Sequence, residues 1–575
     1  MTTIIVDGKP LAVKMGSSFE FVLENRDFTD ADGYSLSIDV PLRGCRQNEE
    51  IFGLRYRPDY GSRAAMFDCE IRTDLFSRYG VLTVVGYEAG DLKCQFLEGR
   101  SVQNFNRTFE DIYINDLSMP YPVYSLGISP TAHYGSIDDG AKWVALPWVY
   151  TEASELQNPV KFVSGILEWD GEILGLSYQP YLIWVVKWMC QEIGYSFDMT
   201  QWEESTDRHL LCCNALPVSW LNNSFAAALP HWTVAEFLVE IERLLCAEFE
   251  VDHKKKHIKF RYSKDVQERK TVTVLDNVID EFSSEVSSED ESIGYRGDAN
   301  ISFDGDNTLF WKSAQCTWLI ELMENTPGGI MEFENYTALL VWFETKKPLI
   351  TGKESERGKD MGKMYHCLAE DTYYIAYVEY ACLKTMPNAY WMILDQVNKM
   401  QPVISDNQNA EDIELRIIPV SSEFVDENGL KAMALSPQVG TDREDFDDDG
   451  IRQPFAMSML NNGEVRKPEF YTKIYVGFWK GMSAFDNGSL PMPRVLPNYN
   501  NPESLALAPR YDTYTSEKLS TKEAVTFRFI SDSIPEVRGI FIIRGKRYRC
   551  LKITANFSPE GMSQLLKGEF VPVVS

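Results

Sequence analysis

Alternating acids in the C-terminal half of the chain form the pattern closest to a ligand-binding motif. Asp445, Asp447 and Asp449 are followed by Gly450, as at the start of a calcium loop, where alternate carboxylates converge on one cation and the glycine allows a sharp turn. The twelfth position of such a loop needs a bidentate glutamate, but this chain has Ala456 there. We expect an acidic, solvated loop, with a weak calcium site (on the order of 10⁻⁴–10⁻³ M) as the alternative.

Two further patterns approach known sites without completing them. Gly352 and Gly358 resemble the glycines of a phosphate-binding loop, but their spacing is one residue too long and Asp360 occupies the position of the essential hydroxyl. His253 and His257 would share one face of a helix as metal ligands do, but the pattern around them is that of a hairpin. We therefore expect loop and turn residues at both places.

Enzyme motifs are also missing from the sequence. There is no GxSxG elbow and no cysteine in a nucleophile signature. We predict a protein that is not an enzyme and that holds no cofactor and no metal. A glycan-active or peptidoglycan-degrading enzyme stays an alternative, because paired catalytic carboxylates need not be adjacent in sequence. A carbohydrate-binding module is another, since tryptophans can stack on sugars, although core or interface positions are more usual for Trp143, Trp148, Trp184 and Trp220.

The charge balance narrows the classes of partner. The 575 residues include 85 acidic and 56 basic side chains, a net charge of −29, and such a field repels phosphate backbones and anionic membranes. We therefore expect no general nucleic-acid binding. The apolar stretch Leu182–Val186 falls far short of the ~20 residues of a membrane helix, and Met1–Pro10 has no secretory pattern. Eleven cysteines without a CxxC pair predict reduced, mostly buried thiols.

The N-terminal half predicts a β domain followed by a mixed one. Alternating apolar residues in Ser35–Leu42 and Tyr79–Tyr87 are typical of strands, so we expect a β domain over 1–145. An α+β domain over 146–290 follows, with helices near 180–194 and 233–247 and a hairpin over 249–262. Thr233 and Glu236 form a capping-box pattern at the start of the second helix. The acidic, serine-rich segment Glu281–Ser292 predicts a linker.

The remaining chain predicts a β-rich middle domain over 291–437 and a C-terminal β domain with long loops over 438–575. The expected strands are Tyr336–Phe343, Tyr373–Cys382, Ile413–Val420 and Phe470–Phe478, with a last hairpin that turns near Gly545. The fold class is thus α+β and predominantly β, with several β-barrel-like or β-sandwich-like domains and one helix-plus-hairpin unit.

Four segments carry a resemblance to a known class of protein. SLSIDVPL and NEEIFG within Ser35–Gly53, QPYLIWVVKWMCQEIGYSF (Gln179–Phe197), Leu229–Phe260, and IPEVRGIFIIRGKRYRCLKITANFSPEGMSQLLKGEF (Ile534–Phe570) resemble tail modules of phages and prophages of gut bacteria. Together they cover less than a third of the chain. The helix-then-hairpin block also looks like tail hub proteins.

The resemblance implies a structural component of a phage tail tip or baseplate hub. Such a protein would assemble with copies of itself into a ring-shaped homo-oligomer, a trimer, and would contact the tail tube, the tape measure and other tip proteins. It would belong to the virion tail and be assembled in the cytoplasm of the host bacterium. Many β domains, abundant aromatic residues and a high net charge are compatible with broad assembly surfaces.

Overall fold

The structure is a computed structural model of the whole chain. It describes residues 1–29, 31–61, 65–101, 109–120, 137–145, 149–151, 156–158, 160–163, 166–169, 176–213, 224–286, 295–303, 330–350, 364–369, 372–380, 390–397, 403–405, 410–419, 424–425, 431–432, 434–436, 439–440, 470–471, 473–478, 505–515, 518–520 and 523–574.

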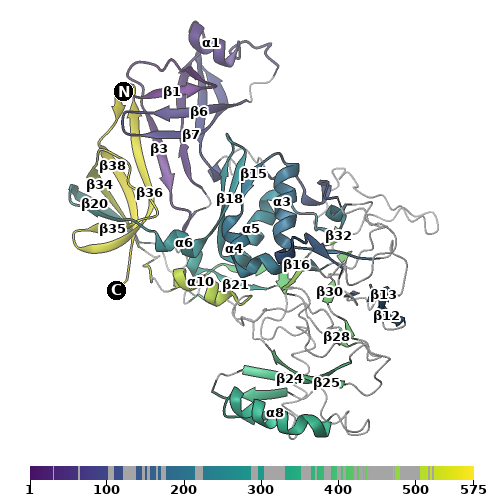
Figure 1. The fold of residues 1–575 in the computed structure, drawn as a ribbon. Coiled ribbons are helices and arrows are strands. Elements are labelled where there is room, and N and C mark those ends of the chain that lie inside the picture. The colour runs from purple at the N-terminus through teal and green to yellow at the C-terminus, as the bar shows by residue number, and fades with distance from the viewer. Residues whose placement is uncertain are drawn as a thin grey trace.

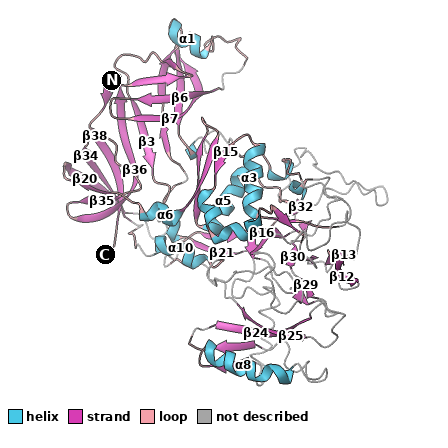
Figure 2. Ribbon diagram, viewed as in Figure 1, coloured by secondary structure: helices cyan, strands magenta, loops and turns pink. Residues whose placement is uncertain are grey.

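The two ends of the chain form one mixed sheet of 15 strands (Figures 1 and 2). Its central path runs β2-β1-β6-β7-β8-β4-β3-β36-β38-β34-β20. The N-terminal strands are β1 (Thr3–Val6), β2 (Lys9–Pro10), β3 (Phe19–Glu24), β4 (Gly33–Ser35), β5 (Ile38–Pro41), β6 (Met66–Arg72), β7 (Ser77–Glu88) and β8 (Asp91–Leu97), with helix α1 (Arg46–Phe52) after β5. The later strands are β19 (Val272–Leu275), β20 (Val278–Val286), β34 (Glu523–Ile530), β35 (Ile540–Ile543), β36 (Lys546–Ser558), β37 (Gly561–Met562) and β38 (Leu565–Pro572).

Strand β3 joins the N-terminal part of this sheet to the C-terminal part. It pairs antiparallel with β36 in a register that sets Phe21 opposite Ala555. Phe21 packs against Phe96 and Phe557, with ring centroids 5.8 and 6.1 Å apart, and all three rings are buried. The alternating apolar residues of both ends therefore fill one continuous core.

The last hairpin turns at Gly545, as the sequence predicts. Strands β35 and β36 pair from Ile540 opposite Arg549 to Ile543 opposite Lys546. Arg544 and Gly545 both have positive φ, 50° and 79°, which is the conformation that a two-residue hairpin turn requires at its centre.

A second unit carries the helices. It contains α3 (Leu182–Glu192), α4 (Thr200–Glu204), α5 (Val234–Leu245) and α6 (Ser263–Glu268), and the sheet β15-β18-β17, formed by β15 (Ser196–Asp198), β17 (Ala247–Asp252) and β18 (His257–Tyr262). Helices α3 and α5 lie within the segments predicted near 180–194 and 233–247, and the hairpin covers the predicted 249–262 and begins two residues earlier, at Ala247. The sequence analysis did not predict α4 and α6. The boundaries of the four predicted domains themselves stay predictions.

Helix α5 begins directly after Thr233, as the predicted capping box requires. The Thr233 hydroxyl accepts the Glu236 N–H at 3.1 Å, and the Glu236 carboxylate accepts the Thr233 N–H at 2.7 Å, which completes the capping box. The apolar side chains spaced three and four apart all face the core: Val234, Phe237, Leu238, Ile241, Leu244 and Leu245.

Smaller sheets occupy the rest of the described chain. The two-stranded sheets are β9 (Trp143–Val144) with β14 (Gln179–Pro180), β12 (Val160–Val163) with β13 (Ile166–Trp169), β21 (Asn300–Phe303) with β26 (Asp412–Leu415), β28 (Phe424–Val425) with β29 (Lys431–Ala432), and β31 (Val439–Gly440) with β32 (Phe470–Tyr471). In the two three-stranded sheets, β10 (Val149–Thr151) lies between β11 (Leu156–Gln157) and β30 (Ala434–Ser436), and β33 (Ile474–Phe478) lies between β16 (Leu210–Cys213) and β27 (Ile417–Pro419). The four-stranded sheet has the order β22 (Ile330–Phe333), β23 (Met364–Cys367), β24 (Thr372–Tyr380) and β25 (Tyr390–Val397). Short 3₁₀ turns are η1 (Ile114–Asp116), η3 (Ile137–Asp139), η5 (Thr206–His209), η7 (Phe225–Ala228) and η8 (Arg296–Asp298), and helices α8 (Tyr336–Ile350) and α10 (Leu507–Thr515) complete the set.

The strand predicted over Tyr336–Phe343 is wrong, because this segment is the first half of helix α8. The Asn335 carboxamide accepts the Ala338 N–H at 3.0 Å, which satisfies a donor of the first turn. Leu339 and Phe343 are buried while Val341 is 63% exposed, so burial follows helical spacing. Because the run is apolar at nearly every position, its pattern fits both the spacing of a helix and the alternation of a strand. Packing against β22 and β23 selects the helix.

The linker predicted over Glu281–Ser292 is also wrong in its first part. Residues 281–286 complete strand β20, which pairs with β34, and residues 287–294 lie outside the described chain. Glu281 and Glu285 are exposed along this outer strand. Polar and charged residues suit a strand at the edge of a sheet, where one side of the backbone is hydrogen-bonded and charges discourage further pairing.

The fold class is confirmed as α+β and predominantly β. The described strands form several sheets and no closed barrel among them. Every cysteine in the described ranges has a free thiol, and all except Cys45 are buried. No helix in the described part is long and apolar enough to cross a membrane.

Candidate functional site

Most residues singled out for chemistry lie outside the described chain. These are the possible calcium ligands Asp445, Asp447 and Asp449, the glycine-rich segment over 352–360, and Trp148 and Trp220. Among the described residues, no group of three or more His, Cys, Asp or Glu side chains could hold a metal ion.

His253 and His257 lie at the two ends of the turn between β17 and β18. The Nδ1 atom of His253 is 2.8 Å from the Tyr195 hydroxyl, and that of His257 is 2.9 Å from the Ser196 hydroxyl. Burial lowers the pKa of His253 to about 4. Each ring thus has its own hydrogen-bond partner at the start of β15, Tyr195 just before the strand and Ser196 as its first residue.

Trp143 and Trp184 are brought together around a third tryptophan. Trp188 stacks on Trp143 with ring centroids 5.5 Å apart and lies 6.3 Å from Trp184. The ammonium groups of Lys142 and Lys187 lie 4.5 and 4.6 Å from the centre of the Trp184 ring. The three rings are half-buried against the largest core, and lysines already cover Trp184 as cation–π partners.

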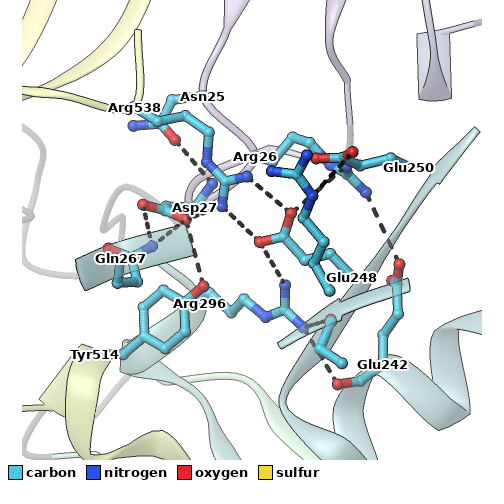
Figure 3. Close-up of polar contacts among 12 residues, drawn as sticks. Asn25, Arg26, Asp27, Glu242, Glu248, Glu250, Gln267, Arg296, Tyr514 and Arg538 are labelled. Atoms are coloured by element: carbon cyan, nitrogen blue, oxygen red, sulfur yellow. Dashed lines mark hydrogen bonds and ion pairs between the residues drawn. The ribbon is translucent and has the colours of Figure 1, made fainter. Parts of the chain in front are cut away.

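The most concentrated chemistry in the described chain is a buried ionic cluster that sequence analysis did not find (Figure 3). We call it the ionic junction and define it by nine charged residues: Arg26, Asp27, Asp32, Arg100, Glu242, Glu248, Arg296, Arg538 and Arg549. They come from the chain after β3 and after β8, from α5, β17 and η8, and from the chain before β35 and within β36. The junction therefore lies where the large sheet meets the helical unit.

Asp27 is at the centre of one half of the ionic junction. Its carboxylate is fully buried and accepts hydrogen bonds from Arg538 at 3.0 Å and from Arg549, whose side chain is also fully buried. Gln267 of α6 donates to both carboxylate oxygens, each at 2.9 Å, and the Tyr514 hydroxyl of α10 lies 3.4 Å away. Four separate segments thus meet at one carboxylate.

Local backbone pairing explains how Asp27 reaches this position. After β3 the Asn25 N–H donates to Leu551 of β36 at 2.8 Å, so the chain stays attached to the sheet. The Asn25 carboxamide donates to the Cys550 carbonyl at 2.7 Å and accepts the Asp27 N–H at 3.0 Å. Strand β36 has an irregularity in its pairing between Cys550 and Lys552, and such irregularities re-aim side chains.

Glu248 is at the centre of the other half. Arg538 grips its carboxylate with two hydrogen bonds of 2.8 and 2.5 Å, the forked geometry that makes arginine–carboxylate pairs strong. Arg26 and Arg296 lie 3.6 Å from the same carboxylate. The side chain is 1% exposed, so a charge that would be costly to bury alone has three cations around it.

Glu242 connects the junction to the end of helix α5. It forms ion pairs with Arg100 and, at 3.8 Å, with Arg26, and it accepts the Phe249 N–H at 2.7 Å. Arg296 donates to the Ala247 carbonyl at 2.7 Å, just after the helix ends. The junction therefore also binds two backbone groups of β17, directly after the end of α5.

Asp27, Glu248 and Arg538 keep their charges at neutral pH. Burial would raise the pKa of Asp27, but Arg538 and Arg549 outweigh it and hold the pKa below its ordinary value. Burial likewise opposes ionisation of Glu248, yet Arg26 and Arg538 bring its pKa far below the usual range. Burial also disfavours the cation of Arg538, but Glu248 raises its pKa. A general acid or base must exchange its proton near the working pH, so these groups are suited to holding segments together.

A cavity of about 340 Å³ adjoins the junction. Its wall includes Arg26, Arg100, Glu242 and Arg296. Because these side chains belong to the ionic junction, the cavity is part of the same polar region and is a suitable place for bridging water.

Helix α10 is bound to the helical unit by side-chain hydrogen bonds. Arg510 binds Asp207 through two hydrogen bonds of 2.9 and 2.7 Å, and the Tyr262 hydroxyl donates to the same carboxylate at 2.8 Å. The Tyr511 hydroxyl donates to the Arg243 carbonyl of α5 at 2.9 Å. With Tyr514 at Asp27, three residues of one short helix contact three different segments.

Sequence reasoning had no signal for this cluster. In β17 the residues Phe249 and Val251 read as the buried face of a strand, which assigns Glu248 to the solvent side. Glu248 is nevertheless buried, because the arginines that surround it arrive from segments up to 290 positions away. Asp27 and Arg549 are separated by 522 positions, and no local pattern marks such a pair.

Of the comparisons with known proteins, the one with solved structures gives matches. No protein-family model and no curated protein matches this chain. Solved structures similar to it include the 43 kDa tail protein of prophage MuSo2 from Shewanella oneidensis, with 7% identity, a TM-score of 0.32, and coverage of 100% of this chain and 98% of that one. Another is a tail protein from Neisseria meningitidis MC58, with 6% identity, a TM-score of 0.31, and coverage of 99% and 96%. Likeness of this size does not decide what the chain does.

Proposed function

We propose that this chain is a structural protein of a phage tail. More specifically, it would be a tip or baseplate hub component that forms a ring with copies of itself. The ring would contact the tail tube, the tape measure and other tip proteins, and it would be assembled in the host cytoplasm. The resemblance of the four segments within Ser35–Phe570 supports the tail assignment.

The ionic junction is the observation that carries a structural role. A part that holds neighbours in place needs its own units fixed relative to one another. Here four carboxylates and five guanidinium groups of the described chain fix the large sheet to the helical unit. A buried charge cluster is satisfied only when every partner is in position, so it favours one arrangement of the segments over others.

The same cluster gives little support to the enzyme alternative. A glycosidase needs one carboxyl group with a raised pKa that can donate a proton. Asp27 and Glu248 are the centres of the buried cluster, and the pKa of each is lowered. Incubation of the purified chain with peptidoglycan should release no soluble fragments, and turnover that is lost on mutation of one or two carboxylates would overturn the proposal.

The proposed self-assembly is tested by measuring the molecular mass of the purified protein in solution. Size-exclusion chromatography with light scattering should give a mass three times the 65.8 kDa of the chain, if a trimer forms without partners. A monomer at high protein concentration would contradict self-assembly of the isolated chain, and repeating the measurement with the neighbouring tail proteins would then test whether they are required.

The location is tested separately. Gold-labelled antibodies raised against the purified chain should mark one end of the tail in electron micrographs of particles from the bacterium that carries the gene. Label that is absent from particles, or that covers the head, would overturn the tail assignment whatever the oligomeric state.

A further inference from the structure

A groove of about 920 Å³ lies on the outside of the C-terminal part of the large sheet. It is formed where the β35–β36 hairpin, the end of the chain, α6 and α10 meet. Its described wall consists of Gln267, Glu268, Lys270, Thr513, Lys518, Ile540, Gly545, Lys546, Arg547, Pro572, Val573 and Val574.

The charge of this groove is opposite to that of the whole chain. Four basic side chains, Lys270, Lys518, Lys546 and Arg547, face one acidic residue, Glu268, among the described lining. The chain as a whole carries a net charge of −29. Lys546 and Arg547 are exposed and form no ion pair within the described residues. A cationic groove therefore interrupts an acidic surface.

The groove also offers apolar surface beside its charges. Val574 is 53% exposed, and Ile540 and Val573 are half-buried in the wall. The chain after β38 is fixed beside them, because the Val573 N–H donates to the Arg547 carbonyl at 3.0 Å and the Val574 N–H to the Lys518 carbonyl at 2.9 Å. Cations and valine side chains thus line the same depression.

We propose that this groove binds an acidic, extended segment of another protein chain. Carboxylates of the segment would pair with Lys546 and Arg547, and apolar residues between them would cover Val573 and Val574. Alternate side chains of an extended segment point to opposite sides, so one segment can present both kinds of residue. The charge complementarity would steer and orient the partner.

Nucleic acid fits the groove less well. A phosphate backbone would match the cations but would leave the valine surface uncovered, and the net charge of −29 opposes approach of a long polyanion. A short acidic segment meets mainly the local charges, because the Debye length is about 8–10 Å at physiological salt. The acidic protein segment is therefore the occupant that both surface properties favour.

The test uses the full chain and a defined probe. The probe is a fluorescein-labelled peptide of glutamate and serine that carries two valines, followed by fluorescence anisotropy. Binding should occur at low salt and weaken as salt rises. Lys546→Gln with Arg547→Gln should weaken binding by about 3- to 30-fold, as expected from loss of two exposed charge pairs. Replacing the valines of the peptide by serine should weaken it further.

A matched variant controls for net charge. Arg528 and Lys567 are exposed and lie opposite each other on β34 and β38 of the same sheet, away from the groove. Arg528→Gln with Lys567→Gln removes the same two charges and should leave peptide binding unchanged. Thermal melts of both variants should match the parent, because all four side chains are on the surface.

Four outcomes would overturn the proposal. They are no binding of the acidic peptide at low salt, equal binding by a peptide with lysine in place of glutamate, equal loss in the two double variants, and tighter binding of single-stranded oligothymidine than of the peptide. If the groove variant changes the mass measured by light scattering while the peptide does not bind, a second copy of this chain occupies the groove instead.

Discussion

Helix α5 takes part in two contacts of opposite character. Along one face, Phe237, Leu238 and Ile241 enter an apolar core. Near its C-terminal end, Glu242 turns toward Arg26 and Arg100 in the ionic junction. The apolar contact needs only side chains of suitable size and tolerates exchange among them. The ionic contact needs each partner present, because a buried charge left alone is strongly destabilising.

Removal of a central carboxylate should give the largest effect. Asp27→Ala leaves Arg538 and Arg549 buried without their shared partner, and we expect it to lower the free energy of unfolding by roughly 3–5 kcal/mol. Denaturant unfolding followed by circular dichroism measures this. The control is Glu50→Ala, which breaks the exposed Arg46–Glu50 pair of 3.2 Å and should cost less than about 0.5 kcal/mol. Equal costs for the two variants would mean that the junction does not hold the units.

The apolar side of the comparison is tested by Leu238→Ala. Leu238 is 3% exposed, so we expect a loss of roughly 2–5 kcal/mol from lost transfer energy and from the cavity left behind. Leu238→Met is the matched control and should cost less than about 1.5 kcal/mol, because it keeps most of the volume. Hydrogen exchange of the α5 amides would locate the change. An unaltered stability in Leu238→Ala would show that this face is not needed for folding.

The ionic junction and the apolar face of α5 should also differ in how their contributions to stability depend on pH. The pKa values of Asp27 and Glu248 are lowered from 3.8 and 4.5, because the surrounding arginines outweigh burial. Their contribution is therefore fully present above about pH 5 and is lost as the pH falls through the lowered values. Acid titration of the unfolding free energy should slope less steeply in Glu248→Gln than in the parent. Leu238→Ala should lower the unfolding free energy by the same amount at every pH, without changing this slope. A changed slope in Leu238→Ala would contradict the separation between the ionic junction and the apolar core.

The smallest expected effect concerns the start of α5. Thr233→Ala removes one half of the capping box and leaves a single N–H of the helix without its partner, so we expect a cost of about 1 kcal/mol. Thr233→Ser keeps a hydroxyl and should be close to the parent in the same unfolding measurement. A cost for Thr233→Ala that equals that of Leu238→Ala would mean that the cap, rather than the apolar face, limits the stability of this region.

Features of the fold that depend on near neighbours in the chain could be predicted from the sequence. The start of α5 follows from Thr233 and Glu236, and its buried face follows from apolar residues spaced three and four apart. The hairpin of β17 and β18 follows from alternation, and the turn at Gly545 from a residue that readily adopts positive φ. These features need only contacts within a few positions, so their patterns are visible in the chain.

Two features depend on contacts between distant segments: the residues that meet at the ionic junction, and the choice between helix and strand where the apolar pattern fits both. Tyr336–Phe343 satisfies both a strand and a helix pattern, and packing on β22 and β23 selects the helix. Asp27 and Glu248 look like solvent-facing acids until the segments that carry Arg538 and Arg549 close over them. The physical reason is that an ion pair 522 positions apart depends on where the whole backbone goes, and neither partner leaves a local mark of it.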